Sequence, residues 1–259
     1  MYKLALLGCG IEYTKSPTVH RAIGKAVGKE ISFDVLDVPV ERLDATVRDA
    51  LRRYDGMYVT KPYKNDVKQY LDRIETACGV NLVRCADRTG FNTDGIGFIR
   101  ALDHAFGQWR SSVNGALVLG AGGAAASVAE ALKNAGKRVY VLDRTAMNAA
   151  RLASTVGAEL YTNQPAELIV NATSAGRHGE DILRALCVGA EFPFGFELIY
   201  DPPETPFLRR LREAGARTSG GLDMLIYQAI AGDAILMGGL DEAAAYDAAA
   251  AALETADGK

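Results

Sequence analysis

The sequence predicts an α/β protein made of two lobes, each with a largely parallel sheet. Apolar segments of strand length alternate along the 259-residue chain with segments of helical spacing, which is typical of parallel sheets covered on both faces. A glycine-rich turn at residues 120–125 lies between one such strand and a helix. The alternation starts again around this turn, so we expect two lobes that join near residue 96.

The first half of the chain supplies the elements of the first lobe. Residues 2–8 are an apolar run ended by glycine, which is typical of a buried strand. In order, the predicted elements are this strand, a helix at 19–28, a strand at 31–38, a helix at 40–54, a strand and turn at 55–64, and a short strand or hairpin at 80–95.

The second half begins with a predicted helix at 97–107 and a strand–turn–helix–strand unit at 115–145. This unit has the length of about thirty residues that a βαβ crossover requires. A helix, two strands with their loops and two further helices follow at 150–157, 166–176, 196–206, 207–216 and 221–239. The alanine-rich tail, 241–259, has high helix propensity and a weak apolar face, so we expect a surface helix that frays.

The composition is that of an ordinary soluble globular protein. Hydrophobic residues make up 49% of the chain and charged residues 24%, and a net charge of -3 gives no electrostatic reason to expect a nucleic-acid partner. The four cysteines show no C-x-x-C pair and only three histidines could support them, so no metal site is expected. We find no leader peptide and no apolar run of the ~18 residues that a membrane span requires, and therefore expect a cytoplasmic protein.

The glycine-rich turn has the pattern of a dinucleotide site. In the stretch LVLGAGGAA (117–125), Gly120, Gly122 and Ala125 occupy the G-x-G-x-x-G/A frame. The first glycine permits the turn, the second leaves room for a pyrophosphate, and the small third residue brings the helix close to the strand. The helix N-terminus then offers amide groups to the phosphates. Asp143 ends the next strand at about the usual spacing of 20 residues for a ribose-binding acid.

Several short motifs occur in an order that resembles the shikimate/quinate dehydrogenase family. They are YTKSPTVH (13–20), VTKPYK (59–64), GVN (79–81), FNTDGIGF (91–98), the glycine turn, DRT (143–145), VNATSAG (170–176), ETPFL (204–208) and GGLDMLIYQA (220–229). The ordered set covers nearly the whole chain. The resemblance implies a substrate-binding catalytic domain at residues 1–95, completed by the C-terminal helix 229–259, and a Rossmann domain at 96–228 that binds NAD or NADP.

By the same resemblance, the protein transfers a hydride between a nicotinamide cofactor and a cyclic hydroxy acid, with 3-dehydroshikimate/shikimate in aromatic amino acid biosynthesis as the first candidate. The lysine of the family motif V-T-x-P-x-K matches Lys64, and the aspartate of N-T-D-G matches Asp94, which implies that these two residues are the catalytic pair. Oxidation of a secondary alcohol requires a group that takes the hydroxyl proton, and a lysine beside an aspartate suits that role if its pKa is tuned. Taken singly, each would be an ordinary turn residue. Lys61 is expected to be exposed.

The resemblance also implies substrate contacts from five polar side chains: Thr14, Ser16, Thr60, Asn81 and Gln228. Their hydroxyl and amide groups suit a small ring acid that carries several hydroxyl groups. In isolation they would serve equally well as helix caps or turn residues.

Two positions depart from the family pattern. Tyr58 stands where relatives carry a substrate-contacting asparagine, and Leu82 stands where they carry a threonine. The reaction type is therefore predicted more firmly than the substrate, and quinate or an aminated shikimate stays open.

The residues expected to hold the cofactor are Gly120, Gly122, Gly123, Ala124, Asp143, Arg144 and Thr145. NADP-dependent relatives have N-R-T where this chain has Asp143-Arg144-Thr145, and Asn148 stands where they often have a second basic residue. A carboxylate suits a ribose 2′-hydroxyl and repels a 2′-phosphate, whereas an arginine attracts the phosphate. These residues slightly favour NAD, while the family resemblance favours NADP.

Two other functions stay open. A methylenetetrahydrofolate dehydrogenase resembles this two-lobe design and also uses a lysine of its first lobe. A binding module would sense a dinucleotide or a ring acid without turnover, which Tyr58 and Leu82 would permit. In every case we expect a small-molecule ligand, no nucleic acid, no membrane, and a monomer or homodimer.

Overall fold

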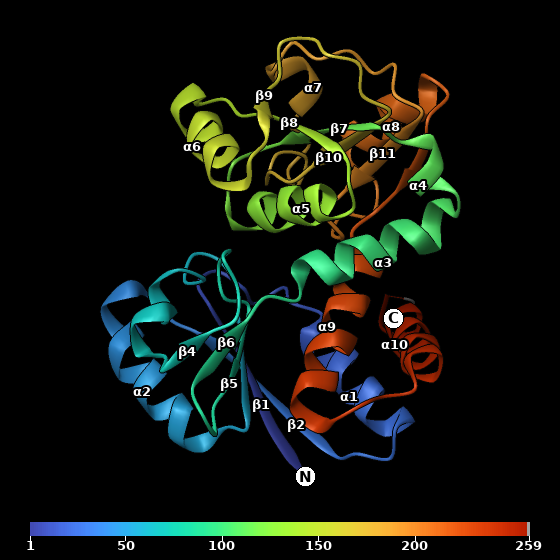
Figure 1. Cartoon of the computed structure of the whole chain (residues 1–259). Helices are drawn as coiled ribbons and strands as arrows, with labels where there is room; N and C mark the ends of the chain where they lie inside the picture. Colours follow the sequence, from blue (N-terminus) through green and yellow to red (C-terminus); the bar gives the residue numbers. More distant parts are fainter. Residues whose placement is uncertain (258–259) are drawn as a thin grey trace. The chain divides into compact units, whose positions relative to one another are not determined.

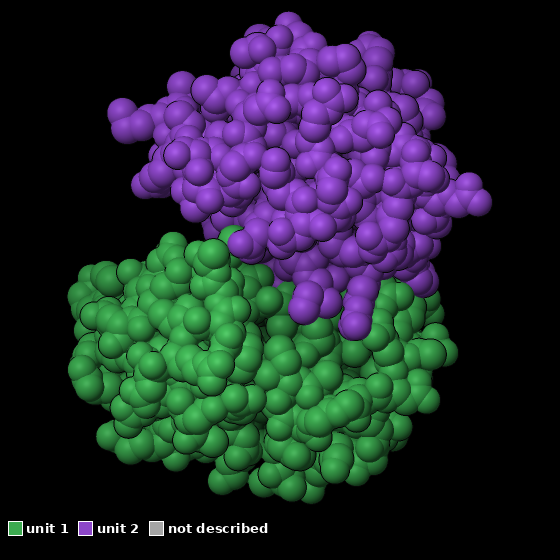
Figure 2. All heavy atoms as spheres, viewed as in Figure 1, with its two compact units in different colours: residues 1–93, 225–259 green, residues 94–224 purple. Residues whose placement is uncertain are grey.

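The chain folds into two compact α/β units, which confirms the predicted fold class. The computed structural model describes residues 1–257. Unit 1 comprises residues 1–93 and the segment from 225 onward, and unit 2 comprises residues 94–224 (Figure 2). Each unit is built around one six-stranded sheet (Figure 1).

The sheet of unit 1 has the strand order β2-β1-β3-β5-β6-β4. Its strands are β1 (Tyr2–Gly8), β2 (Ile31–Asp37), β3 (Gly56–Val59), β4 (Arg73–Ile74), β5 (Leu82–Arg84) and β6 (Thr89–Phe91). β1 is parallel to both β2 and β3, and β5 and β6 form the antiparallel hairpin expected in residues 80–95. Because β1 and β3 are parallel, the loops that leave them start at the same edge of the sheet.

Helices cover both faces of this sheet. They are α1 (Ser16–Ala26), α2 (Leu43–Arg53), which follows the short 3-10 turn η1 (Val40–Arg42), α9 (Leu222–Met237) and α10 (Glu242–Asp257), with a second 3-10 turn, η2, at Asp66–Tyr70. Successive side chains of a strand point to opposite faces. Met57 and Val59 accordingly pack with residues of α2, whereas Tyr58 packs on the other face, where α9 also contributes side chains.

The two helices expected at 221–239 and 241–259 are both present, so the segment 229–259 that was assigned to the first domain is not one continuous helix. It contains most of α9 and the separate helix α10, with a break at residues 238–241. α10 packs along α1 and buries Ala245, Ala249 and Leu253, so it is more than a surface helix. Small side chains allow this close helix contact, which is why the sequence shows only a weak apolar face.

The sheet of unit 2 is entirely parallel, with the order β12-β11-β10-β7-β8-β9. Its strands are β7 (Gly115–Leu119), β8 (Arg138–Leu142), β9 (Glu159–Leu160), β10 (Leu168–Asn171), β11 (Phe194–Glu197) and β12 (Arg217–Ser219). The chain builds outward from β7 to β9 and then returns to place β10 on the other side of β7. This is the doubly wound Rossmann order, in which ligands bind beyond the strand ends where the direction of building reverses.

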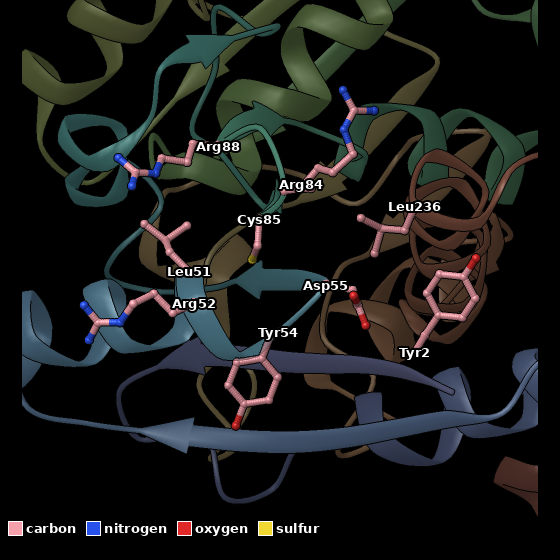
Figure 3. Close-up of a pocket in the computed structure, with 10 residues that line it drawn as sticks. Tyr2, Leu51, Arg52, Tyr54, Asp55, Arg84, Cys85, Arg88 and Leu236 are labelled. Atoms are coloured by element: carbon pink, nitrogen blue, oxygen red, sulfur yellow. The ribbon is translucent and has the colours of Figure 1, made fainter.

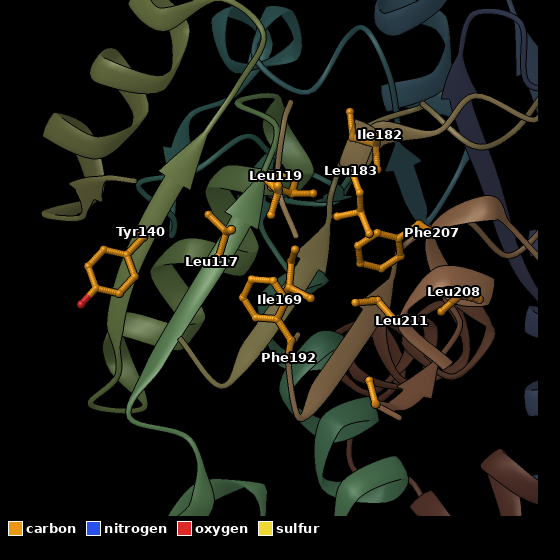
Figure 4. Close-up of a cluster of buried hydrophobic side chains, with 12 residues drawn as sticks. Leu117, Leu119, Tyr140, Ile169, Ile182, Leu183, Phe192, Phe207, Leu208 and Leu211 are labelled. Carbon is orange, nitrogen blue, oxygen red and sulfur yellow. The ribbon is translucent and has the colours of Figure 1, made fainter. Parts of the chain in front are cut away.

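The helices of unit 2 are α3 (Asp94–Phe106), α4 (Trp109–Ser112), α5 (Gly123–Asn134), α6 (Ala146–Val156), α7 (Ile182–Ala185) and α8 (Pro206–Glu213). On one face of the sheet, Leu117 and Ile169 belong to a buried cluster with Leu183 of α7 and Phe207 of α8 (Figure 4). The other notable change from the sequence-based boundaries is the start of α3, which begins at Asp94 rather than near residue 97.

Candidate active site

The segment that contains Lys64 leaves the carboxyl end of β3 as a compact turn. β3 ends at Val59, and residues 61–65 form the turn. The buried Tyr63 anchors it, because its hydroxyl donates a hydrogen bond to the carbonyl of Val38 at 2.7 Å. The backbone N–H of Val80 donates to the carbonyl of Lys64 at 2.8 Å. Lys64 is thus half-buried, and the turn that carries it is held by the buried side chain of Tyr63 and by a backbone hydrogen bond from Val80.

The other lysine of the turn has a different environment. Lys61 is exposed, and its ammonium group lies 5.6 Å from the centre of the Tyr13 ring. It therefore makes a surface cation–π contact of the kind that contributes little to stability.

Asn81 organises the neighbouring segment. Its side-chain oxygen accepts from the N–H of Thr93 at 2.8 Å, and its amide nitrogen donates to the Thr93 hydroxyl at 3.0 Å. The same nitrogen lies 3.4 Å from the side-chain oxygen of Gln228 on α9, so two candidate substrate residues lie side by side. Both partners of the Asn81–Thr93 pair are buried, so each satisfies polar groups of the other that water cannot reach.

Asp94 follows Thr93 directly and is the first residue of α3. It is buried, with 7% of its surface exposed. The amino end of a helix carries partial positive charge, which attracts a carboxylate at that position. The observed helix start therefore places this side chain at the positive end of the helix dipole, a point that the sequence-based start at residue 97 had missed.

Thr14 and Ser16 form a second pair, at the start of α1. The Thr14 hydroxyl donates to Ser16 Oγ at 3.1 Å, and the Ser16 N–H lies 3.3 Å from Thr14 Oγ1. Thr60 lies at the end of the neighbouring strand β3, where its N–H donates to the carbonyl of Leu7 at 2.9 Å. Its methyl group occupies the space beside Gly8, since any side chain at residue 8 would overlap it. All three hydroxyl residues thus lie in the segments that follow β1 and β3, which leave the same edge of the sheet.

Tyr58 is directed into the core of unit 1 rather than to its surface. The side chain is 3% exposed, and its hydroxyl donates to Oδ1 of Asp233 at 2.8 Å. Burial and the neighbouring carboxylate raise the pKa of this phenol well above its usual value, so it stays protonated. Leu82, the other residue that departs from the family pattern, pairs with Tyr58 across β3 and β5 and is fully buried. Both departures therefore lie in the same buried cluster.

The glycine turn of unit 2 has the geometry that a bound pyrophosphate requires. Gly120 has a φ of +105°, which favours glycine, and a side chain there would meet Thr173 and the carbonyl of Ala172. A Cβ at Gly122 would stand in open space, next to the amino end of α5. The N-cap residue of α5 is Gly122 itself, which has no side chain to accept hydrogen bonds from the first amides of the helix. Its first amide groups and the empty cradle at Gly122 therefore fit a phosphate.

The acidic residue expected near the ribose lies directly after β8. Oδ1 of Asp143 accepts from the backbone N–H of Thr145 at 2.8 Å, which turns this oxygen toward its own chain. Arg144 and Thr145 are exposed. Gly123 and Ala124, the first residues of α5, complete the predicted cofactor set at the end of β7.

A buried carboxylate that was not singled out from the sequence supports the loop beside this turn. Glu197, at the end of β11, accepts hydrogen bonds from Asn171 Nδ2 at 2.9 Å and from the Thr205 hydroxyl at 3.0 Å. Burial raises the pKa of Glu197 from 4.5 to about 7, against the opposing effect of its hydrogen-bond donors. Asn171 in turn accepts from the hydroxyl of Thr173, whose methyl group lies next to Gly120. An acid inside the apolar stretch FELIY was the available sign of this network.

Unit 1 also has a surface hollow at the opposite edge of its sheet. Tyr2 and Asp55 line it near the starts of β1 and β3, together with Arg52, Arg84 and Arg88 (Figure 3). The Arg84 guanidinium is engaged by Asp87 at 2.7 Å, and in the close-up it points away from the other two arginines. None of the candidate substrate residues lines this hollow, so it is not the predicted site.

No helix within residues 1–257 is both long enough and apolar enough to cross a membrane. The same residues contain no group of three or more His, Cys, Asp or Glu side chains that could hold a metal ion.

Comparisons with known proteins place these features in a family context. A family model described as the shikimate dehydrogenase substrate binding domain matches residues 6–80. The chain is 34% identical over 240 residues to the NADP(+) shikimate dehydrogenase of Thermus thermophilus, which covers 88% of this chain and 89% of the relative. The NADP(+) shikimate dehydrogenase of Methanothrix thermoacetophila is 34% identical over 253 residues, 92% of each chain. The crystal structure of shikimate 5-dehydrogenase from Thermus thermophilus in complex with NADP(H) and shikimate matches with a TM-score of 0.85 at 31% identity, over 97% of this chain and 100% of that chain.

Proposed function

The chain belongs to the shikimate/quinate dehydrogenase family, and we propose that it interconverts shikimate and 3-dehydroshikimate with a nicotinamide dinucleotide. It is thus an oxidoreductase that acts on a CH–OH group. The observation that best supports a working site in this chain is the Asn81–Thr93 pair, which fixes a candidate substrate residue to the residue that precedes Asp94.

Lys64 takes the hydroxyl proton as the alcohol is oxidised and returns a proton to the oxygen in the reverse direction. Such proton transfer contributes roughly 10²- to 10⁴-fold to the rate of a reaction of this kind. Asp94 is the second member of the catalytic pair that the family resemblance implies, and a carboxylate in that role stabilises the ammonium form of the lysine once the proton has been taken. The fixed turn that carries Lys64 limits the entropy lost when the lysine meets its substrate.

The substrate is held by Thr14, Ser16, Thr60, Asn81 and Gln228. Their hydroxyl and amide groups both donate and accept, so they recognise ring hydroxyl groups and a carboxylate. An analogue that lacks one of these hydroxyl groups would leave a polar side chain without its partner, and would be rejected for that reason.

The cofactor binds at the glycine turn, where Gly120, Gly122 and the first amides of α5 receive the pyrophosphate. When bound, it supplies the hydride acceptor or donor. The chain is similar to NADP(+) shikimate dehydrogenases, and this similarity supports NADP as the cofactor. Asp143 by itself would slightly favour NAD. Arg144 then attracts the 2′-phosphate, while Asp143 has one oxygen engaged by Thr145 and opposes the phosphate less than a free carboxylate would.

A matrix of substrates and cofactors tests this proposal. Shikimate, quinate and an aminated shikimate are each assayed with NAD and with NADP, and the absorbance of the reduced nicotinamide is followed. We expect the highest kcat/KM for shikimate with NADP. A higher kcat/KM for quinate than for shikimate would show that quinate is the substrate. Thermal stabilisation by shikimate without any cofactor reduction would indicate a binding module instead. Turnover of methylenetetrahydrofolate would contradict the proposal.

A further inference from the structure

Tyr58, Asp233 and His20 form a buried polar cluster in unit 1, which we call the tyrosine triad. The Tyr58 hydroxyl donates to Asp233 Oδ1 at 2.8 Å, and Nδ1 of His20 lies 2.9 Å from Asp233 Oδ2. Asp233 is fully buried, and the other two residues are nearly so. A carboxylate withdrawn from water requires donors in place of water, so Tyr58 and His20 both stabilise it.

The shape of the surrounding residues is matched to the phenol ring. A side chain at Gly232, next to Asp233 on α9, would overlap the hydroxyl end of Tyr58. The His20 ring lies 4.3 Å from the centre of the Tyr58 ring and stacks on Phe33 at 4.6 Å. Tyr58 also lies 3.5 Å from the carbonyl of Ala229, but the shorter bond to the carboxylate fixes its donor direction. The glycine, the aspartate and the tyrosine therefore form one complementary set.

The triad joins three elements of unit 1 that are far apart in the sequence, namely β3, α1 and α9. Each of these elements or its adjoining turn also carries a candidate substrate residue: Thr60 follows Tyr58, Ser16 precedes His20 by about one helical turn, and Gln228 precedes Asp233 on α9. Hydrogen bonds between the triad residues hold the three elements at a fixed spacing. The same bonds therefore fix the distances among the three substrate residues.

We propose that the tyrosine triad is a positioning device that sets the affinity of the enzyme for its ring-acid substrate. Tyr58 makes no contact with the substrate in this proposal, because its single hydroxyl hydrogen is committed to Asp233. It acts through Thr60, Ser16 and Gln228, whose spacing it maintains. Side chains that are already ordered lose less entropy when a ligand binds, so loosening the triad weakens binding. This inference rests on the proposed function for the identity of the ligand. The claim that the triad holds β3, α1 and α9 at a fixed spacing does not depend on that function.

Tyr58→Phe tests the triad because it removes one hydroxyl group and keeps the ring. We expect the KM for shikimate to rise about tenfold, the factor that corresponds to one lost hydrogen bond of ordinary strength. The kcat and the KM for the nicotinamide cofactor should stay close to the parent values. Tyr54→Phe is the matched control, since the Tyr54 hydroxyl donates to Asp34 at 2.7 Å in an exposed pair. An unchanged KM for shikimate in Tyr58→Phe would overturn the proposal.

Amide hydrogen exchange separates this proposal from the proposed function. In Tyr58→Phe, amides in the first turn of α1 and around Gln228 should exchange faster at a temperature well below Tm, while those of α2 should not change. Equal exchange in parent and variant would refute the positioning role, whatever the enzyme turns over. If the parent oxidised no ring acid, the proposed function would fail, and this exchange result would still decide the role of the triad.

Asp233→Asn provides a second variant if Tyr58→Phe does not fold. It keeps the shape of the side chain and an oxygen that accepts from Tyr58, but removes the charge. We expect a rise in the KM for shikimate in the same direction, with little change in kcat. A variant in which Tm falls but the KM for shikimate is unchanged would show that the triad only stabilises the fold.

Discussion

Asn81 and Thr93 are joined by reciprocal hydrogen bonds: Thr93 N–H donates to Asn81 Oδ1 at 2.8 Å, and Asn81 Nδ2 donates to the Thr93 hydroxyl at 3.0 Å. Both residues are buried, and the next residue along the chain is Asp94. One asparagine therefore has two roles in the proposed site. It is a candidate substrate contact, and it fixes the segment that leads into the proposed catalytic aspartate.

Replacing this asparagine should affect stability and activity together. Asn81→Ala leaves the buried N–H and hydroxyl of Thr93 without these partners, so the free energy of unfolding should fall by about 1–3 kcal/mol. The kcat/KM for shikimate should also fall, because the substrate residue is lost and the segment before Asp94 is loosened. Denaturant unfolding and steady-state kinetics measure the two effects. Thr93→Val keeps the bond from the Thr93 N–H and should show the smaller loss; an equal or larger loss would argue against this account.

The two lysines of the turn should respond differently to truncation. Lys64→Ala should lower kcat by about 10²- to 10⁴-fold, the contribution expected of general acid–base catalysis. Cofactor binding, followed by the fluorescence of the reduced nicotinamide, should be unchanged. Lys61→Ala is the control, because its ammonium group lies at the surface over Tyr13, and it should retain parental turnover. Near-normal kcat in Lys64→Ala would exclude the proposed catalytic role.

Asp143 and Arg144 should act in opposite directions on cofactor choice. Asp143→Asn keeps an oxygen for the Thr145 N–H but removes a negative charge, so kcat/KM for NADP relative to NAD should rise about fivefold, as expected for one screened charge near a phosphate. Arg144→Ala should lower kcat/KM for NADP more than for NAD. Arg151→Ala, another exposed arginine, on α6, controls for the loss of charge alone. If neither Asp143→Asn nor Arg144→Ala changed the ratio of kcat/KM for NADP to kcat/KM for NAD, this loop would not distinguish a ribose 2′-phosphate from a 2′-hydroxyl.

Glu197 should make the stability of the protein depend on pH. Burial raises the pKa of its carboxyl from 4.5 to about 7, so the folded state binds a proton that the unfolded state releases between these values. Its stabilising contribution is complete below about pH 4.5 and is lost as the pH rises through 7. The loss should amount to about 3 kcal/mol. Glu197→Gln cannot ionise and should flatten this part of the stability curve measured by denaturant unfolding. An unchanged slope in that variant would assign the dependence to other groups.

The sequence was most informative where function depends on short segments. The glycine turn, the acid after β8 and the order of the motifs predicted a Rossmann unit, and the parallel sheet confirms that class. These predictions work because a tight turn, a strand and a helix start each require particular residues within a few positions. The catalytic and binding assignments to Lys64, Asp94 and the polar side chains near them stay predictions.

Longer-range relationships were missed for a physical reason. Alternation along β3 shows that Tyr58 and Val59 point to opposite faces, but it does not tell which face carries the substrate residues and which lies in the core. From the sequence alone, Tyr58 is expected to change a substrate contact, because it stands where relatives carry an asparagine. Its partner Asp233 lies 175 residues away, in the apolar stretch AIAGDAILM of α9. An acid in such a stretch is a sign of a buried carboxylate, but it does not tell which side chains bind that carboxylate.

The sequence by itself determined the α/β class, the glycine turn between β7 and α5 and the family, because these follow from local periodicity, from backbone requirements at glycine and from the order of short motifs. Only the tertiary structure decided that Tyr58, Leu82 and Asp233 lie in one buried cluster, that Asn81 holds Thr93, and that Glu197 supports the loop beside Gly120. Burial and hydrogen bonding between distant segments depend on how strands and helices pack. That packing sets the local environment, and the environment decides what each of these polar side chains can do.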